Sequence, residues 1–375
     1  MKMKAAVLNA VNEPLAIEEV ELDPPRGGEV LVQLKATGVC HSDVHYVQGD
    51  NARELPLILG HEGAGIVQEV GPGVTRVKPG DHVVLSFLPS CGTCRWCRSG
   101  HPVMCDVSAN LRGGTMPDGT RRLHRSRDGR DINNFLFVST FAEYSVVPEA
   151  SVIPVPVEAP LERICLLGCG FTTGFGTVTN VARVQRGESV TIIGCGGLGL
   201  AAIQAARLAG AATIVAVDVH EEKLAMAKAF GATHTLISRR NNDQVLQEIM
   251  ALTDGLGTDY SLEFVGGAAS PATADLAFRA IRKCGTMCFA GLAPDHLDSM
   301  PISPKMLMMQ QKRVVGAIFG DSQFRSDIPR YVELYMQRQI NLDDMVSQEI
   351  PLEDINSAVQ EVIAGNKVAR QVIRF

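Results

Sequence analysis

Four cysteines in the stretch "CGTCRWCRSGHPVMC" have the residue type and spacing of a metal site. They are Cys91, Cys94, Cys97 and Cys105. Residues three apart rarely meet disulfide geometry, and the spacing fits the runs of iron–sulfur ferredoxins poorly. Four thiolates on short glycine-containing loops can converge on one Zn²⁺ and saturate its tetrahedral shell. We therefore predict a structural zinc, and metal chemistry in this protein would need a second site with an open position.

Candidates for a second metal site are scattered along the chain. Cys40 lies in "GVCHSDVH", His61 and Glu62 lie in "GHEGAG", and Cys169 lies in "LLGCGFTTG". Taken singly, a cysteine is often just a small buried apolar residue, and a lone histidine is more often a core or surface residue than a ligand. Only their combination points to a catalytic metal.

A glycine-rich turn in "TIIGCGGLG" follows an apolar strand and opens a helix. Gly194, Gly196 and Gly199 form a GxGxxG pattern, with Gly197 and Leu198 between the last two. The first glycine permits a tight turn, the second lets the main chain approach a pyrophosphate, and the third allows close helix–strand packing. The helix N-terminus offers free N–H groups to phosphate oxygens. The pattern predicts a dinucleotide site.

Asp218 ends the next apolar strand, "TIVAVD". A carboxylate there accepts hydrogen bonds from the adenosine ribose and repels the 2′-phosphate of NADP, so NAD is the predicted cofactor. An Asp that merely caps the following helix is the alternative, and the two roles are compatible. Lys223, one helical turn further, is placed to reach the same ribose or a phosphate.

Composition excludes several classes of partner. The chain has 375 residues, a net charge of −6 and ten cysteines. Nothing in this charge balance favours nucleic acid or an anionic membrane. The N-terminus has neither a signal peptide nor a membrane span, so we expect a cytoplasmic protein whose cysteines are thiols or metal ligands.

The arginine-rich run at 121–130 is interpreted as a solvated loop or as a patch that steers an anion.

The rhythm of the chain predicts two domains of different class. Short β-branched runs at 29–39, 63–71 and 81–87 indicate an antiparallel β region. From residue 171 apolar strands alternate with helices, which predicts a parallel sheet covered on both faces, including a helix at 274–285. A six-stranded doubly wound sheet is complete without the last predicted strand, at 369–375. We therefore expect the C-terminal segment to return to the first domain.

Taken in order, these motifs resemble the zinc-dependent medium-chain alcohol dehydrogenases. The resemblance covers essentially the whole chain. Within the family, the sequence is most similar to the longer branch, which includes the liver-type alcohol dehydrogenases and the glutathione-dependent formaldehyde dehydrogenases. It implies a GroES-like β-rich catalytic domain at 1–170 and 319–375 and a Rossmann domain at 171–318. Its motifs are "GVCHSDVH", "GHEGAG", "PGDHVV", the four-cysteine lobe, "GTMPDGT", "STFAEYSVV", "GCGFTTGFG", "GCGGLG" and "GAIFG".

The resemblance assigns a catalytic zinc, giving two zinc ions per subunit. Cys40, His61 and Cys169 would bind it, with Glu62 behind it, and the fourth position would stay open for water or an alcohol. Asp43 would orient His61.

The resemblance also assigns a proton relay and contacts to the cofactor. Ser42 and His45 would carry the alcohol proton through the cofactor ribose to water. Thr173 and Leu198 would flank the nicotinamide. The pyrophosphate would be held by Arg370 and by His41, where some relatives have arginine.

The substrate implied by the resemblance is a primary aliphatic or aromatic alcohol, or its aldehyde. The matching pocket positions are all apolar, and Leu292 would also contact the cofactor. Formaldehyde–glutathione chemistry is the alternative, supported by Arg112 and the run at 121–130. A second alternative keeps NAD tightly bound, as in nicotinoproteins. A homodimer is expected, with a tetramer possible. The pocket positions are Phe87, Phe135, Leu292 and Ile318.

Overall fold

A computed structural model describes residues 1–238, 241–365 and 369–375. The chain divides into two compact units, one of residues 1–169 and 323–375 and one of residues 170–322. The boundaries expected from the sequence, 170/171 and 318/319, lie close to these divisions. The six strands of the second unit form one entirely parallel sheet, and the first unit is β-rich.

A small closed barrel forms part of the first unit. The first residues of β1 alternate, with Lys2 and Lys4 exposed and Met3 buried, and the strand is then buried from Ala5 to Leu8. The barrel order is β1 (Lys2–Leu8), β2 (Ala16–Leu22), β7 (Leu123–Arg125), β8 (Asp131–Asn134) and β4 (Leu57–Ile58).

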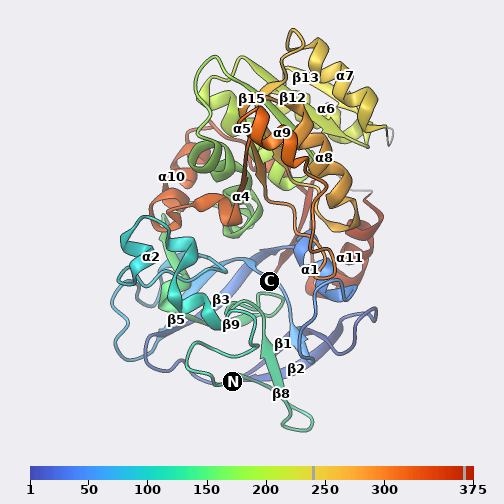
Figure 1. Ribbon diagram of the computed structural model, residues 1–375. Coiled ribbons are helices and arrows are strands. Elements are labelled where there is room, and N and C mark those ends of the chain that lie inside the picture. Colours follow the sequence, from blue (N-terminus) through green and yellow to red (C-terminus); the bar gives the residue numbers. More distant parts are fainter. Residues whose placement is uncertain (239–240, 366–368) are drawn as a thin grey trace. The chain divides into compact units, whose positions relative to one another are not determined.

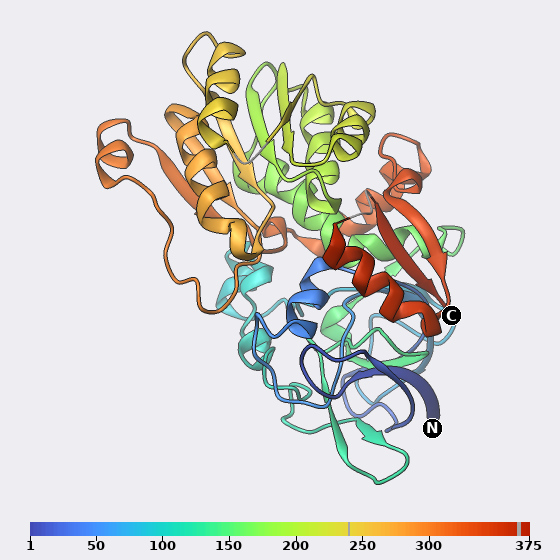
Figure 2. The ribbon, with the colours of Figure 1, turned by 90° about the vertical axis from the view of Figure 1, so that its right-hand side faces the viewer.

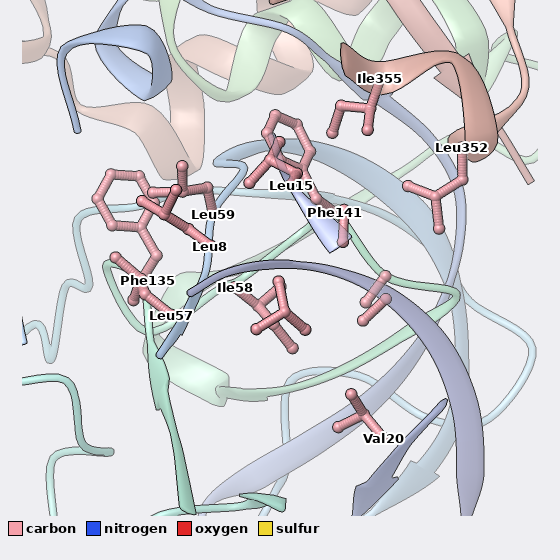
Figure 3. Close-up of a cluster of buried hydrophobic side chains, with 14 of the residues drawn as sticks. Leu8, Leu15, Val20, Leu57, Ile58, Leu59, Phe135, Phe141, Leu352 and Ile355 are labelled. Atoms are coloured by element: carbon pink, nitrogen blue, oxygen red, sulfur yellow. The ribbon is translucent and has the colours of Figure 1, made fainter. Parts of the chain in front are cut away.

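The barrel interior is filled by one hydrophobic cluster (Figure 3). Leu8, Leu57 and Ile58 are at most 1% exposed, and so is Phe141. Side chains of Leu352 and Ile355, from the C-terminal part of the chain, reach the same cluster. Burial of this apolar surface therefore fixes the tail of the chain to the N-terminal strands.

A seven-stranded sheet forms the rest of the first unit's framework. Its order is β10 (Val152–Val155), β6 (His82–Leu85), β5 (Glu62–Val70), β3 (Glu29–Gly38), β18 (Arg370–Arg374) and β17 (Val346–Ile350), with β9 (Tyr144–Pro148) also on β3. The strands predicted at 29–39, 63–71 and 81–87 are confirmed as β3, β5 and β6.

The last strand returns to the first unit, as predicted. β18 pairs antiparallel with β3 and parallel with β17. Figure 2 shows β17 and β18 as neighbouring arrows beside helix α11 (Ile355–Ala364). The return matters for function because it places Arg370 beside the residues that follow β3.

The second unit is a six-stranded doubly wound parallel sheet (Figure 1). The strand order is β13 (His234–Ile237), β12 (Thr213–Asp218), β11 (Ser189–Ile193), β14 (Thr258–Glu263), β15 (Ile281–Phe289) and β16 (Arg313–Gly316). The connecting helices are α5 (Gly197–Ala209), α6 (Glu221–Phe230), α7 (Asn242–Ala251) and α8 (Ser270–Ala280). The order reverses between β11 and β14, which is where such sheets bind ligands.

One helix prediction was wrong at both ends, because α8 begins at Ser270, four residues before the predicted start. The pattern predicted helix at 274–285, but α8 ends at Ala280. Ile281 is already extended, with φ −77° and ψ 146°, and it pairs with Thr258 of β14. Gly285, the last residue of the predicted helix, lies within β15. Strand pairing across the sheet overrode the local helical pattern.

The remaining helices are short or lie at the edges of the units. They are α1 (His41–Val47), α2 (Arg95–Arg98), α3 (Leu161–Ile164), α4 (Gly170–Gly176), α9 (Pro304–Met309) and α10 (Phe324–Met336). Within the described residues no single helix has the length and apolar character needed to cross a membrane; one bent pair, Leu161–Gly168 with Gly170–Ala182, meets that test only when taken together.

Candidate metal centres and cofactor turn

The pairing of β3 with β5 brings the first candidate ligands together. Gly38 lies opposite Glu62 in this antiparallel pair. Cys40 follows Gly38 by two residues and His61 precedes Glu62 by one, so both stand just beyond the paired ends of their strands. Residues far apart in the sequence thereby become neighbours.

Cys169 completes the buried group. The preceding residue, Gly168, is packed so closely that a Cβ there would lie 2.7 Å from the Leu85 carbonyl oxygen and 3.3 Å from the Glu62 Cα. Because Gly168 has no side chain, the backbone of residues 168–169 can pack closely enough to bring Cys169 beside the other candidate ligands. Ligand atoms of Cys40, His61, Glu62 and Cys169 all lie within 4.8 Å of one another, and all four residues are buried.

Asp43 holds this group in place from helix α1. Its carboxylate accepts hydrogen bonds from the backbone N–H of Cys40 at 3.1 Å and of Gly60 at 3.1 Å. It also lies 2.9 Å from Nδ1 of His61. Because Nδ1 is engaged by the carboxylate, Nε2 of His61 is the nitrogen left for a metal. Asp43 is fully buried, so its three contacts replace its hydration.

The chemistry of the buried donors fits zinc. A hydrogen bond from the Cys169 thiol lowers the pKa of Cys40 well below its usual range, and the charge of Arg370 acts in the same direction. A thiolate is the form that binds metal. Two sulfurs and one imidazole nitrogen match the donor set of an open zinc site, in which a fourth position remains for water or substrate.

Glu62 and Arg370 lie behind the donors. Burial raises the pKa of Glu62 to about 7, against the opposing charge of Arg370. The Arg370 Nη2 lies 3.4 Å from Oε1 of Glu62 and 3.3 Å from Sγ of Cys40. A Cβ at Gly38 would lie 2.2 Å from Oε2 of Glu62, so a larger residue there would displace this carboxylate from its present position. The pyrophosphate contact expected of Arg370 stays a prediction.

The four cysteines at 91–105 form a second group whose sulfurs lie within 4.8 Å of one another. Backbone N–H groups point at the sulfurs: Thr93 and Cys94 donate to Sγ of Cys91, at 3.4 and 3.3 Å. These bonds and the Thr93 hydroxyl overcome burial and lower the pKa of Cys91 to about 6. The donor set is all sulfur, which leaves no position for substrate and suits a structural zinc.

The two residues of the predicted relay lie on α1. Ser42 is half-buried and His45 is buried, while His41 is exposed on the same helix. The rings of His41 and His45 are 6.0 Å apart between centroids. Nδ1 of His45 lies 2.8 Å from Oδ2 of Asp50, a residue that the sequence did not single out.

In the second unit, the structure explains each glycine of the turn. Gly194 has φ +93°, which an L side chain rarely adopts. A Cβ at Gly199 would lie 2.0 Å from the Gly194 carbonyl oxygen, so the helix could not pack this closely with any other residue. A Cβ at Gly196 would meet no protein atom within 4 Å, which leaves this stretch of main chain open to a ligand. Gly197 and Leu198 begin α5, whose N-terminus supplies N–H groups.

Asp218 lies at the end of β12 beside this turn. Its Oδ2 accepts from the backbone N–H of Cys195 at 2.8 Å, and Oδ1 accepts from Val219 at 2.8 Å and His220 at 3.0 Å. The carboxylate therefore braces the glycine turn and the two residues that precede helix α6, whose N-cap is His220. Lys223 lies in the first turn of that helix and is half-buried.

The other residues predicted to contact cofactor or substrate differ in how far they are buried. Thr173 is buried in α4, and Leu292 is half-buried just after β15. The His61 ring lies edge-on to Phe87 and Phe135, at 5.6 and 5.8 Å between centroids, so two of the expected pocket residues do border the buried group. Ile318 is 46% exposed.

The arginine-rich run is engaged in ion pairs. Arg122 is 2% exposed and donates to both carboxylate oxygens of Glu29, at 2.9 and 2.6 Å. The Nε of Arg125 lies 2.9 Å from Glu18. These pairs hold the loop to the barrel, so the structural interpretation of these two arginines is favoured.

Sequence reasoning missed two residues that support the centres. Asp50 contacts His45, and no spacing rule connects them. Arg325 of α10 donates to the Ser90 carbonyl oxygen beside the four-cysteine lobe, across 235 positions of sequence. Only the fold could reveal either contact.

Comparison with known proteins decides the family. The model of the alcohol dehydrogenase GroES-like domain matches residues 26–157, and that of the zinc-binding dehydrogenase domain matches residues 197–337. An NDMA-dependent alcohol dehydrogenase of Amycolatopsis methanolica is 40% identical over 368 residues, which cover 98% of each chain. The chain belongs to the zinc-dependent medium-chain alcohol dehydrogenase family.

Solved structures of alcohol dehydrogenases resemble the whole chain. A Burkholderia ambifaria alcohol dehydrogenase zinc-binding domain protein has a TM-score of 0.93 and 37% identity, covering 100% of this chain and 99% of that one. The benzyl alcohol dehydrogenase of Acinetobacter calcoaceticus has a TM-score of 0.92 and 31% identity, with the same coverage. The predicted combination of a GroES-like domain and a Rossmann domain is thereby confirmed.

Proposed function

We propose that this alcohol dehydrogenase oxidises primary aliphatic or aromatic alcohols to aldehydes, reversibly, with NAD as the hydride acceptor. The observation that carries the proposal is the buried set of two sulfurs and one imidazole, oriented by Asp43 and bordered by Phe87 and Phe135. An open metal position beside aromatic side chains suits a hydroxyl group on an apolar tail.

Each residue has a defined task in this proposal. Cys40, His61 and Cys169 would hold a zinc ion, which when bound polarises an alcohol oxygen and favours loss of its proton. Asp43, which lies 2.9 Å from Nδ1 of His61, would leave Nε2 of that ring as the nitrogen that holds the ion. Ser42 and His45, on the same helix, would accept the released proton and pass it towards water.

The glycine turn and Asp218 support NAD. The turn presents open main chain at Gly196 and a helix N-terminus for the pyrophosphate. Asp218 presents a carboxylate where the 2′-phosphate of NADP would meet repulsion. Replacing this carboxylate in Asp218→Ser should raise the kcat/KM ratio of NADP to NAD by at least about tenfold. An unchanged ratio would show that Asp218 does not select the cofactor.

The direct test is a kinetic screen of the purified protein. Ethanol, hexanol and benzyl alcohol are offered with NAD or NADP, and reduced cofactor is followed by absorbance. Turnover with NAD and an apolar alcohol is expected. Formaldehyde with and without glutathione is the matched comparison, and activity restricted to that pair would replace our proposal by the glutathione-dependent alternative.

A second candidate keeps the cofactor bound. The relative from Amycolatopsis methanolica is named as NDMA-dependent, which favours an enzyme that does not exchange free NAD. In that case the protein would carry NAD through gel filtration and would turn over alcohol with NDMA but not with added NAD. Protein that elutes without cofactor and turns over with free NAD would exclude it.

We further propose a cytoplasmic homodimer. None of the ten cysteines, all of which lie within the described residues, forms a disulfide, as suits a reducing compartment. In the second unit, α9 carries Met308 and Met309, which are 69% and 68% exposed, close in sequence to the edge strand β16. An exposed apolar patch beside a sheet edge favours pairing with a second copy. Light scattering after gel filtration distinguishes monomer, dimer and tetramer.

A further inference from the structure

We propose that Asp50 is a positioning residue that fixes the tautomer of His45. The inference rests on the proposed function, because His45 matters only if it accepts a proton during alcohol oxidation. It starts from one contact: Nδ1 of His45 lies 2.8 Å from Oδ2 of Asp50. The side chain of His45 is 9% exposed, so this carboxylate is the partner that defines the ring's orientation.

The backbone brings Asp50 back onto His45. Helix α1 ends at Val47, and Gly49 takes φ +79°, a value that turns the chain over the helix end. The backbone N–H of Asp50 then donates to the His45 carbonyl oxygen at 2.9 Å. Asp50 is therefore bound to His45 twice, once through the main chain and once through the side chain. The main-chain bond fixes the backbone of Asp50 beside His45 and so pre-organises its carboxylate to hold the imidazole.

The Asp50 carboxylate determines which ring nitrogen of His45 carries the proton. An ionised carboxylate can only accept, so the proton of a neutral His45 must lie on Nδ1. Nε2 then keeps its lone pair and is the atom able to take up a proton. Without Asp50 both tautomers are accessible, and the one protonated on Nε2 cannot accept at that atom. Asp43 does the same for His61 at 2.9 Å, so the region around α1 uses one device at two histidines.

Other charged groups near α1 are engaged elsewhere. The Arg53 guanidinium lies over the Tyr46 ring, 4.6 Å from its centroid. On α11, which packs against α1, the Glu361 carboxylate accepts from Nε2 of Gln371 at 2.6 Å. Asp50 is thus the carboxylate that the structure places on His45.

The first test reads the tautomer directly. Protein with ¹⁵N-labelled histidine, purified without added alcohol or cofactor, is examined by two-bond ¹H–¹⁵N correlation, and His45→Gln assigns the signal. We expect a single Nδ1–H tautomer in the wild type and a mixture in Asp50→Ala. Glu54→Ala is the control on the same loop: Glu54 pairs with Arg121, and its removal should leave the spectrum unchanged. A wild-type tautomer in Asp50→Ala would overturn the proposal.

The second test is kinetic. Asp50→Ala should lower kcat about tenfold with little change in the KM for alcohol, because proton transfer is impaired while binding is not. The double variant with His45→Gln should be no slower than His45→Gln alone, and Asp50→Glu should recover part of the rate. Thermal melting verifies that each variant is folded. Additive losses would show that Asp50 does not act through His45.

The outcomes separate this inference from the proposed function. If the wild type oxidises no alcohol under any condition, the proposed function fails while the tautomer measurement still stands. If the wild type is active and His45→Gln is slow but Asp50→Ala is not, the inference alone fails.

Discussion

The two cysteine groups differ in almost every physical respect. The lobe at 91–105 is contained within a short local stretch, uses only sulfur, and has three half-buried members and one buried member. The group of Cys40, His61, Glu62 and Cys169 is buried and combines two sulfurs and one imidazole nitrogen with a carboxylate behind them. In this chain local spacing brings the four sulfurs of the lobe together, whereas the members of the mixed group are delivered by separate elements.

The supporting residues differ in the same way. Sulfurs of the lobe are stabilised by N–H groups of their own loop, such as Thr93 to Cys91 at 3.4 Å. The buried group depends on side chains from α1 and β18, since Asp43 contacts His61 and Arg370 contacts Cys40. The lobe should therefore govern stability, and the buried group should govern activity.

The largest effect is expected from Cys169→Ser. Loss of a thiolate from the open site should lower kcat/KM about a thousandfold, equivalent to about 4 kcal/mol of transition-state stabilisation. Zinc content should fall from about two ions to about one per subunit, with an unchanged circular dichroism spectrum. Cys165→Ser is the matched control, because that buried thiol lies four residues away and outside the group. Full activity in Cys169→Ser would refute the assignment.

Cys97→Ser should chiefly reduce stability. Binding of a structural zinc contributes directly to folding, so its loss should lower Tm by roughly 10 °C. Enzyme kept below the new Tm should retain most of its kcat. Cys284→Ser, at an exposed cysteine outside both groups, should melt like the wild type. A variant that is inactive yet fully stable would reverse the roles of the two centres.

Asp43→Asn tests how far the buried group depends on its support. A neutral amide holds Nδ1 of His61 less firmly, so zinc affinity and kcat/KM should each fall about 10- to 100-fold. Zinc affinity is measured by competition with a chromogenic chelator. The lobe zinc should remain, since Asp43 makes no contact with the lobe. Wild-type affinity in this variant would contradict the role of Asp43.

The smallest effect is expected from Arg325→Met at the lobe. Its guanidinium donates to the Ser90 carbonyl oxygen, so the substitution removes a partner from a buried acceptor. A loss of about 1 kcal/mol corresponds to a Tm lower by roughly 3 °C. Activity should not change. Arg330→Met, at an exposed position of the same helix, is the control, and equal melting of the two variants would show that Arg325 does not brace the lobe.

Features that a local sequence pattern marks were predicted, whereas features that depend on particular contacts of the folded chain were not. The β-rich unit, the parallel sheet and the return of the last strand were predicted from local patterns and are confirmed. The helix predicted at 274–285 lies at Ser270–Ala280, and its predicted end came too late because Ile281 pairs with β14, which no local pattern records. The contact of Asp50 with His45 also escaped prediction, since it depends on a turn at Gly49.

The sequence by itself determined the sulfur lobe and the glycine turn, because both depend on residues a few positions apart. Backbone geometry at that range is set by spacing and by glycine. Only the tertiary structure decided how Cys40, His61 and Cys169 meet. That meeting depends on the register in which Gly38 lies opposite Glu62, and register is selected by burial of whole strands rather than by any local motif.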